Sequence, residues 1–244
     1  MIKAKSDATE DPTSKERLSQ ILQILDGEIR ERLFLQFLKK NNHTDVALVQ
    51  NIKKSVGPKS MILHGATIWS NAMMNAYTTN DVFLQDNLSW VAQATNWNRF
   101  NATASLGIIH SGNKKNAMTI LNPYFSGIGS GGEQMSSPYS SAGAYFAYGL
   151  IHQNCYAEDT VNYFLDGYRN SGQSEPIQHG VSLGLGLVAM ASKNQDIYEH
   201  MRNTLYSNAD SAIIGEAAAY GMGLVMVGAA NQESIQDILS HMED

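Results

Sequence analysis

Four segments between residues 106 and 225 repeat one apolar, helix-forming pattern centred on a glycine. These glycines are Gly107, Gly149, Gly186 and Gly223, so the spacings are 42, 37 and 37 residues. A fainter copy places Asn71 at the same point, 36 residues before Gly107. A period of this size built from helices is typical of a stacked solenoid, in which each unit buries its apolar face against its neighbours. The repeat therefore predicts an all-α fold.

A second, amphipathic helix is expected after each glycine-bearing helix. Asn194 and Asn231 lie eight residues after their glycines, and each is followed within the first turn by an acidic residue. Asparagine is a favoured N-cap, and an acid in the first turn suits the helix dipole. Apolar residues then recur at spacings of three and four, and hairpin turn signals are absent. The pattern predicts an α-solenoid of about five helix-pair repeats over residues 58–244.

The remaining segments differ in composition. Residues 1–14 are polar and of mixed charge, so we expect a disordered tail. Residues 15–57 carry three amphipathic helix patterns without the glycine, and we expect them to form rod-like helices that precede the repeats. Residues 126–141 are rich in glycine and serine and include Pro138, which predicts a flexible loop. That loop accounts for the spacing of 42.

Glycine inside a helix costs about 1 kcal/mol relative to alanine, so the repeated glycines need an offsetting gain. Small residues also recur six and two positions before the last three glycines, and a spacing of four places such a pair on one helix face. Flat faces of this kind let neighbouring helices approach closely and gain dispersion contacts. A tightly packed inner row implies curvature, as in part of a toroid. The glycines expected to form this structural surface are Gly107, Gly143, Gly149, Gly180, Gly184, Gly186, Gly221 and Gly223.

Composition narrows the class of partner and compartment. The net charge is −6 and 16% of residues are charged, whereas a nucleic-acid or anionic-membrane partner would favour a basic face. The single cysteine, Cys155, cannot form an intrachain disulfide and is interpreted as a structural thiol in a reducing compartment. The longest uncharged, mostly apolar stretch covers residues 217–230 and is too short to span a bilayer. We expect a soluble intracellular protein.

Seven histidines raise the hypothesis of a metal site. His110 and His152 each lie three residues after a repeat glycine, while His64 and His179 lie near the starts of their helices. Zinc requires three or four ligands at about 2 Å, whereas packed helices stand roughly 8–10 Å apart. One histidine per repeat is therefore poorly placed to converge. We expect structural histidines, with no metal and no cofactor.

The enzymatic alternative is an α/α-toroid hydrolase that uses two acids. Adjacent acids occur at residues 158–159 and 243–244, but adjacent positions on a helix point to different faces. Trp69, Trp90 and Trp97 fall at helical spacings that suit packing more than substrate binding. We therefore expect no enzymatic activity and no catalytic residues. A cleft with two carboxylates about 5–10 Å apart would favour the alternative.

The glycine-rich segments over residues 178–187 and 215–224 resemble the proteasome/cyclosome repeat. Within that group, Asn-Asn-His-Thr-Asp at residues 41–45 and Ala-Thr-Asn-Trp at residues 94–97 resemble the family of non-ATPase regulatory subunit 1, the larger repeat scaffold in the base of the 19S regulatory particle. The resemblance extends from about Leu18 to the end of the chain. The second scaffold subunit of that particle and the large scaffold of the anaphase-promoting complex stay open as alternatives.

The resemblance implies a non-catalytic scaffold in ubiquitin-dependent protein degradation, present in cytoplasm and nucleus. Members hold together the ATPase ring, lid subunits and ubiquitin receptors, and they contain a rod, a toroid and a small C-terminal domain. This chain is far shorter, with too few repeats to close the toroid and no counterpart of the tail that docks a ubiquitin receptor. Residues 126–141 also match poorly. The uncapped stacking face of the last repeat predicts self-association.

Overall fold

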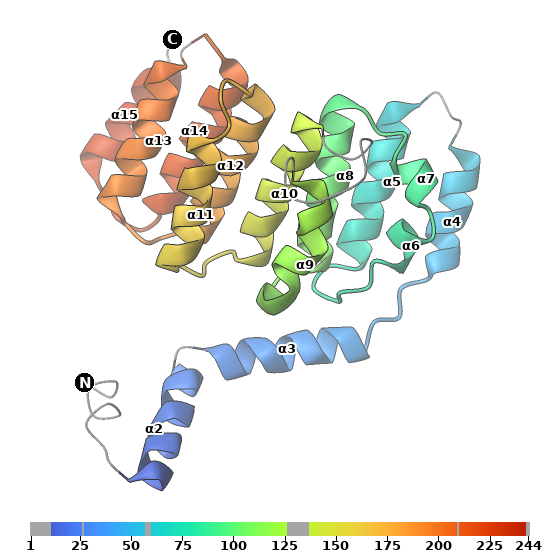
Figure 1. Cartoon of the computed structure of the whole chain (residues 1–244), viewed down its shortest axis with the longest axis horizontal. Coiled ribbons are helices and arrows are strands. Elements are labelled where there is room, and N and C mark those ends of the chain that lie inside the picture. The colour runs from blue at the N-terminus through green and yellow to red at the C-terminus, as the bar shows by residue number, and fades with distance from the viewer. Residues whose placement is uncertain (1–10, 26, 57–59, 126–136, 209, 243–244) are drawn as a thin grey trace. The chain divides into compact units, whose positions relative to one another are not determined.

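The computed structural model describes residues 11–25, 27–56, 60–125, 137–208 and 210–242. These residues form α-helices and two short 3-10 helices joined by turns, and no strand occurs among them (Figure 1). The predicted all-α class is confirmed. The chain divides into two compact units between His43 and Thr44, and each unit is described by itself.

The first unit consists of α2 (Pro12–Leu25) and α3 (Glu28–Lys40), which contact each other. α2 begins inside the segment expected to be a disordered tail. Asp11 accepts a hydrogen bond from the Ser14 amide at 3.0 Å, and Pro12 has the fixed φ that suits the first helical turn. Residues 12–14 are therefore helical, while residues 1–10 lie outside the described part. Phe34 and Phe37 are more than 60% exposed within this unit.

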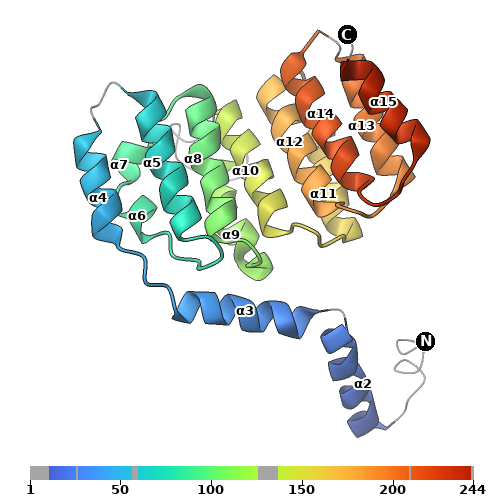
Figure 2. The ribbon, with the colours of Figure 1, turned by 180° about the vertical axis from the view of Figure 1, so that it is seen from behind.

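The second unit is built on a row of five inner helices, each of 14 residues, which pack side by side in chain order (Figure 2). Each repeat glycine is the twelfth residue of its helix. The twelfth residue of the first inner helix is Ala72, so the register of the faint copy is one residue later than Asn71 predicts. The inner helices are α5 (Met61–Met74), α8 (Asn96–Ile109), α10 (Pro138–Ile151), α12 (Glu175–Val188) and α14 (Ala212–Val225).

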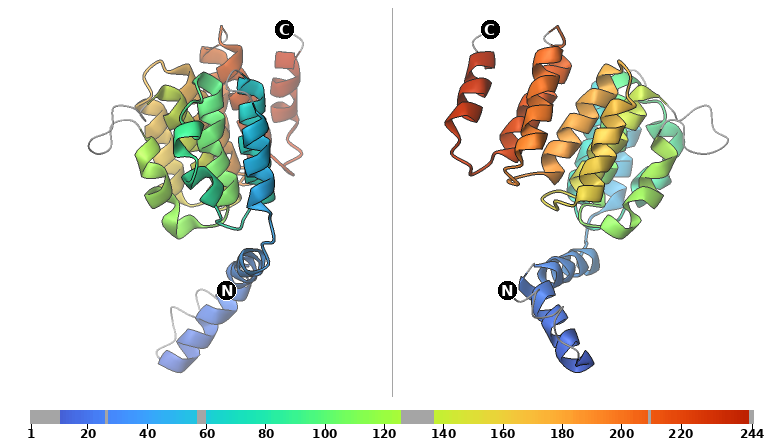
Figure 3. Two further views of the ribbon diagram at one scale, coloured as in Figure 1. Left: turned by 90° about the vertical axis from the view of Figure 1, so that its right-hand side faces the viewer. Right: turned by 60° about the vertical axis from the view of Figure 1, so that its left-hand side comes forward.

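Outer helices form a second layer, and most pack on the inner helix that follows them in the chain. α4 packs on α5, α9 on α10, α11 on α12, and α13 on α14, while α15 packs weakly on α14 (Figure 3). The outer layer comprises α4 (Val46–Ser55), α6 (Val82–Gln85), α7 (Leu88–Val91), α9 (Ala117–Leu121), α11 (Glu158–Arg169), α13 (Gln195–Ser207) and α15 (Gln232–Met242), with 3-10 turns at Lys114–Asn116 and Asn122–Tyr124.

Side-chain caps fix several helix starts. The Asn194 side chain accepts from the Ile197 amide at 3.1 Å, and Asn231 accepts from the Ser234 amide at 3.2 Å, so both asparagines cap helices as expected. Ser137 accepts from the third residue of α10 at 3.2 Å. Because of this cap and a proline at the first position, residues 138–141 are helical and not part of a flexible loop. Residues 126–136 lie outside the described part.

The core lies between the two layers. Phe83, Phe164 and Tyr198 are among the largest buried side chains. Val49 of α4 is 1% exposed and belongs to the same cluster as Ile68 of α5. α4 therefore packs with the repeats, although it lies in the segment expected to form rod-like helices. The expected division of the chain at residue 57 stays a prediction. Within the described ranges, every helix is too short or too polar to cross a membrane.

Candidate functional site

The repeat glycines of α8, α10 and α12 contact the backbone of the next inner helix. A Cβ atom added at any of them would lie closer to a neighbouring Cα than the 3.0 Å below which real Cβ contacts essentially never fall. The distances would be 2.5 Å from Gly107 to Ala147, 2.4 Å from Gly149 to Gly184, and 2.7 Å from Gly186 to Gly221. At these three points the helices meet backbone to backbone, which leaves no room for any side chain.

A second set of glycines faces the preceding inner helix. Gly143 and Gly180 lie six residues before the repeat glycines of their own helices. A Cβ at Gly143 would lie 2.4 Å from the Phe100 carbonyl oxygen, and one at Gly180 would lie 2.2 Å from that of Ala142. α10 and α12 thus each have bare backbone at a point of contact with both neighbouring inner helices.

The other predicted glycines behave differently from one another. A Cβ at Gly184 would also lie 2.4 Å from the Phe164 ring, and one at Gly221 would lie 3.0 Å from the Met201 methyl carbon, so both also face the outer layer. Gly223 has no atom within 4 Å of its Cβ position. Unlike its three equivalents, it contacts no neighbouring helix in the described part of the chain.

Backbone amides of the loops add a second connection between repeats, which the sequence reasoning missed. The last carbonyls of a helix lack partners within the helix. Here the last carbonyls of an inner helix accept hydrogen bonds from backbone amides in the loop that follows the preceding inner helix. The residues that donate have positive φ, which turns their amides toward these carbonyls. These bonds join Tyr77 to Ile108 (3.1 Å), Thr79 to Ile109 (3.0 Å), Asn154 to Leu187 (2.9 Å), Ala191 to Leu224 (2.9 Å) and Lys193 to Val225 (3.0 Å).

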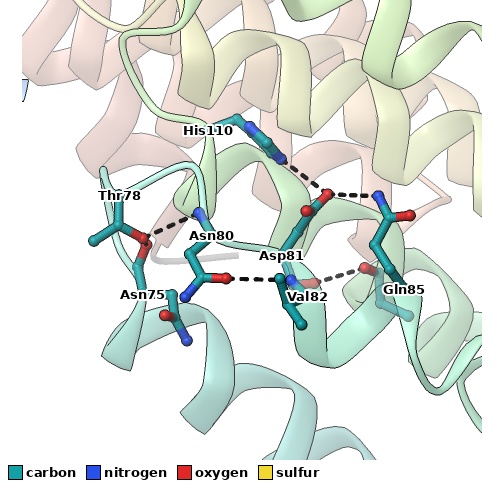
Figure 4. A network of polar contacts seen from close by, with 9 residues as sticks. Asn75, Thr78, Asn80, Asp81, Val82, Gln85 and His110 are labelled. Atoms are coloured by element: carbon teal, nitrogen blue, oxygen red, sulfur yellow. Dashed lines mark hydrogen bonds and ion pairs between the residues drawn. The ribbon is translucent and has the colours of Figure 1, made fainter. Parts of the chain in front are cut away.

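Side chains of the first such loop form a polar network (Figure 4). His110 Nε2 lies 3.3 Å from an Asp81 carboxylate oxygen, to which the Gln85 amide donates at 3.1 Å. The hydrogen bond with His110 lowers the pKa of Asp81, with Gln85 adding to the effect against the opposing cost of burial. The Thr78 hydroxyl oxygen accepts from the Asn80 amide at 3.2 Å. The network holds the loop against α8, at the end of which His110 lies.

The predicted histidines do not converge. His64 Nε2 lies 2.9 Å from the Trp90 carbonyl oxygen. His152 Nδ1 lies 3.0 Å from a carbonyl of its own helix, and burial lowers the pKa of its imidazole. His179 Nδ1 lies 2.9 Å from a carbonyl of α14. The residues that the structure describes contain no group of three or more histidine, cysteine or acidic side chains able to hold a metal ion.

Two of the three predicted tryptophans, Trp90 and Trp97, contribute to packing. The Trp90 ring lies 4.1 Å from the His64 ring, and the Trp97 ring lies 5.4 Å from Phe100 and 5.3 Å from Tyr139, measured between centroids. Trp97 thereby joins α8 to the start of α10.

A cavity of about 70 Å³ lies between α7, α8 and the start of α10. Its walls are mostly apolar, with Arg99, Thr103, Tyr124 and Ser140 as the polar lining, and no carboxylate is among its described lining residues. The acids at residues 158–159 are exposed in the first turn of α11, and residues 243–244 lie outside the described part. The cavity therefore lacks the paired acids of a glycoside hydrolase.

The fold and these contacts define an all-α solenoid whose inner helices meet backbone to backbone. No family model matches the chain. Over almost its whole length, however, the chain is homologous to part of the 26S proteasome non-ATPase regulatory subunit 1, and the resemblance seen in the sequence is confirmed.

Three relatives illustrate the relationship. The 26S proteasome non-ATPase regulatory subunit 1 homolog A of Arabidopsis thaliana is 44% identical over 226 residues, 93% of this chain and 22% of the relative. The subunit 1 of Drosophila melanogaster is 40% identical over 230 residues, 94% and 22% of the two chains. The regulatory subunit RPN2 of Saccharomyces cerevisiae is 37% identical over 230 residues, 92% and 24%. The chain thus spans less than a quarter of these relatives.

Proposed function

We propose that this chain is a non-catalytic scaffold segment of the base of the proteasome regulatory particle, acting in ubiquitin-dependent protein degradation. The observation that carries the proposal is 44% identity to a subunit whose name marks it as regulatory and non-ATPase. Proposed partners are the ATPase ring, lid subunits and ubiquitin receptors, and the proposed compartments are cytoplasm and nucleus.

The repeat glycines support a structural role for the stack. Closest approaches of 2.4–2.7 Å from added Cβ atoms to neighbouring Cα atoms recur at equivalent positions. A hinge or a ligand site needs one such position, whereas a packing rule needs one in each repeat. We propose that these glycines set the curvature of the solenoid, as part of a toroid. We also propose that the surface of the solenoid binds proteins and catalyses no reaction.

The test is affinity purification of the full tagged chain from cells that contain proteasomes, followed by mass spectrometry. Recovery of ATPase and lid subunits in fixed ratio supports the proposal. A matched Gly149→Leu variant, which cannot keep the contact with Gly184, is expected to lose them. A preparation of the folded wild-type chain that lacks every ATPase and lid subunit contradicts the proposal.

Self-association through the last repeat is part of the same proposal. Tyr220 of α14 is 61% exposed, and Ile235 of α15 is 53% exposed. Apolar side chains gathered at one edge favour association with protein. Light scattering over a range of concentrations measures it, and a monomer at the highest concentration contradicts it.

A further inference from the structure

The cavity beside α8 lies where the outer layer is built from unusually short helices. The outer helices α11 and α13 have 12 and 13 residues, whereas α6 and α7, which precede α8, have four each. Asn87 separates these two, because its side chain donates to the Phe83 carbonyl at 2.6 Å and satisfies the end of α6. α8 therefore lacks a full-length outer helix, and the cavity of about 70 Å³ lies between α7, α8 and the start of α10 (Figure 1).

The apolar walls of the cavity enclose the volume of a short aliphatic chain. Leu84, Leu88, Val91 and Leu106 are among the lining residues. One water molecule needs about 10–15 Å³ of such volume, so a cavity of about 70 Å³ accepts roughly five groups of that size. A buried water also needs two or more polar partners, and aliphatic walls supply none. A chain of about four carbon atoms suits these walls better than a cluster of waters.

Two hydroxyl groups on the lining are short of hydrogen-bond partners. Ser140 is 3% exposed, and its hydroxyl contacts only one other described residue, the Thr103 hydroxyl at 3.4 Å. That distance is well beyond the usual value of about 2.7–2.8 Å, and Thr103 already donates to the Arg99 carbonyl. The Tyr124 hydroxyl bonds to no described residue, and burial, with the charge of Asp81 second, raises its pKa. Both hydroxyls therefore keep a proton that an acceptor inside the cavity can take.

Arg99 supplies the charge at the cavity. Its Nε donates to the Ala94 carbonyl at 3.0 Å and its Nη2 to the Ala92 carbonyl at 3.2 Å, and these two bonds fix the guanidinium beside the cavity. Its Nη1 bonds to no described residue. No acidic side chain is among the described lining residues, and Asp81 is already paired with His110. The charge on the lining is therefore positive, which favours an anionic group.

We propose that this cavity binds a free short-chain monocarboxylate, with an aliphatic chain of about four carbon atoms between α7 and α8 and the carboxylate on Arg99, Ser140 and Tyr124. The chain is held by apolar walls, and the carboxylate accepts from the guanidinium and from the two hydroxyls that lack good partners. The C-terminal leucine of a polypeptide presents the same chemistry, and the experiment separates the two sources. Binding of this kind requires no catalysis and does not depend on the scaffold role.

The first experiment is a titration of the full chain, labelled at leucine and valine methyl groups, with sodium pentanoate. Saturable shifts in the methyl NMR signals of Leu84, Leu88 and Leu106 are expected, with a Kd on the order of 1 mM for a ligand of about seven heavy atoms. The methyl groups of Leu239, 47% exposed on α15, should not shift. Pentanamide and pentylammonium are expected to bind about tenfold more weakly or less, because the first lacks the negative charge and the second reverses it.

Variants of the lining residues test each part of the site. Ala102→Leu fills the cavity from α8 and is expected to abolish binding, while leucine suits the helix. Ser140→Ala removes the poorly paired hydroxyl and is expected to weaken binding about three- to tenfold. Arg99→Gln is expected to remove the preference for pentanoate over pentanamide, and Arg99→Lys to keep it. Ser89→Ala, at an exposed residue of α7, is the matched control and should leave the affinity unchanged.

A blocked dipeptide that ends in leucine, measured beside its C-terminal amide, separates the two sources. Weaker binding of this dipeptide than of pentanoate supports the free acid, whereas tighter binding that the amide loses would assign the cavity to a polypeptide terminus and overturn it. The proposal also fails if no methyl signal shifts saturably, if Ala102→Leu retains binding, or if pentylammonium binds as tightly as pentanoate. None of these results depends on proteasome binding, so the scaffold proposal can fail separately.

Discussion

Single glycines decide how close the repeats stand. At Gly149 a methyl group would lie 2.4 Å from the Gly184 Cα atom. The methyl group is attached directly to one helix backbone and the Cα atom belongs to another, so neither can rotate aside as the end of a long side chain would. At Gly223 the same methyl group meets open space. Gly149 and Gly223 occupy the same position in the sequence repeat, but the first is in contact with a neighbouring backbone and the second is not. Substitution by alanine is therefore expected to affect them differently.

Gly149→Ala is expected to lower the free energy of unfolding by about 1–3 kcal/mol, because the added methyl overpacks the interface between α10 and α12. Gly223→Ala is expected to raise it by up to about 1 kcal/mol, because alanine is the better helix former and meets no neighbour. Urea unfolding followed by circular dichroism measures both. Changes of the same sign in the two variants would show that backbone contact is not the reason for the glycines.

The buried His152 and the half-buried His200 give the fold a dependence on pH. Burial lowers the pKa of His152 and of His200 below the ordinary value of 6.5, with smaller effects from nearby charges. The unfolded chain therefore binds more protons than the folded chain once the pH falls below about 7, and stability falls with pH through that range. The loss is complete only below the folded-state pKa values.

His152→Gln and His200→Gln are each expected to flatten this dependence, by at most about 1.4 kcal/mol per pH unit for each histidine. The measurement is the unfolding midpoint in urea between pH 7.5 and 5. His43→Gln, at an exposed residue, is the matched control and should leave the slope unchanged. A slope that survives the double substitution would assign the effect to other groups.

At the scale of helices, the packed unit is an outer helix with the inner helix that follows it. α15 is the exception, because it packs only weakly on α14. Its main polar attachment is Asp237, which accepts from the Tyr198 hydroxyl at 2.7 Å and from the Arg202 guanidinium at 3.3 Å. Burial, with this hydrogen bond second, raises the pKa of Tyr198 to about 12.

Asp237→Ala is therefore expected to release α15 while α13 and α14 stay folded. Amide exchange in α15 should accelerate roughly tenfold or more, because opening of a weakly packed end needs little free energy. Gln236→Ala, at an exposed residue in the middle of the same helix, is the control. Equal acceleration across α13 and α14 would mean that Asp237 holds the whole repeat and not one helix.

For the molecule as a whole, the repeats and the first two helices are separate compact units. The core residues of the repeats, from Val49 to Val225, all lie after His43. In the first unit the large apolar side chains of α2 and α3 remain mostly exposed, with Leu25 64% and Phe37 63% accessible. Helices with so little buried surface gain little from tertiary packing.

Deletion of residues 1–43 is therefore expected to leave the cooperative unfolding of the repeats intact, with a midpoint within a few degrees of that of the full chain. Differential scanning calorimetry of the two chains measures the change. Solubility should improve, because Phe34 and Phe37 are removed. A truncated chain that loses its cooperative transition would place the first helices within the folding unit of the repeats.

Much of the architecture could be predicted because it follows local rules that repeat. The spacing of Gly107, Gly149, Gly186 and Gly223 gave the number of later repeats, and Asn194 and Asn231 marked helix starts through capping. The faint first copy was misplaced by one residue, since Ala72 and not Asn71 takes the twelfth position of α5. Asparagine and alanine are both tolerated there, so local pattern alone could not choose.

The sequence by itself determined the helical class, the period and the kinship, because apolar spacing, capping and glycine placement are properties of neighbouring residues. Only the tertiary structure decided which backbone each glycine touches and how the loop amides bond to the next helix. These depend on atoms brought together from different repeats. For the same reason Gly223 cannot be told from the other repeat glycines in the sequence. Only the fold shows that its Cβ position is unoccupied by any neighbour, whereas theirs lie against another helix.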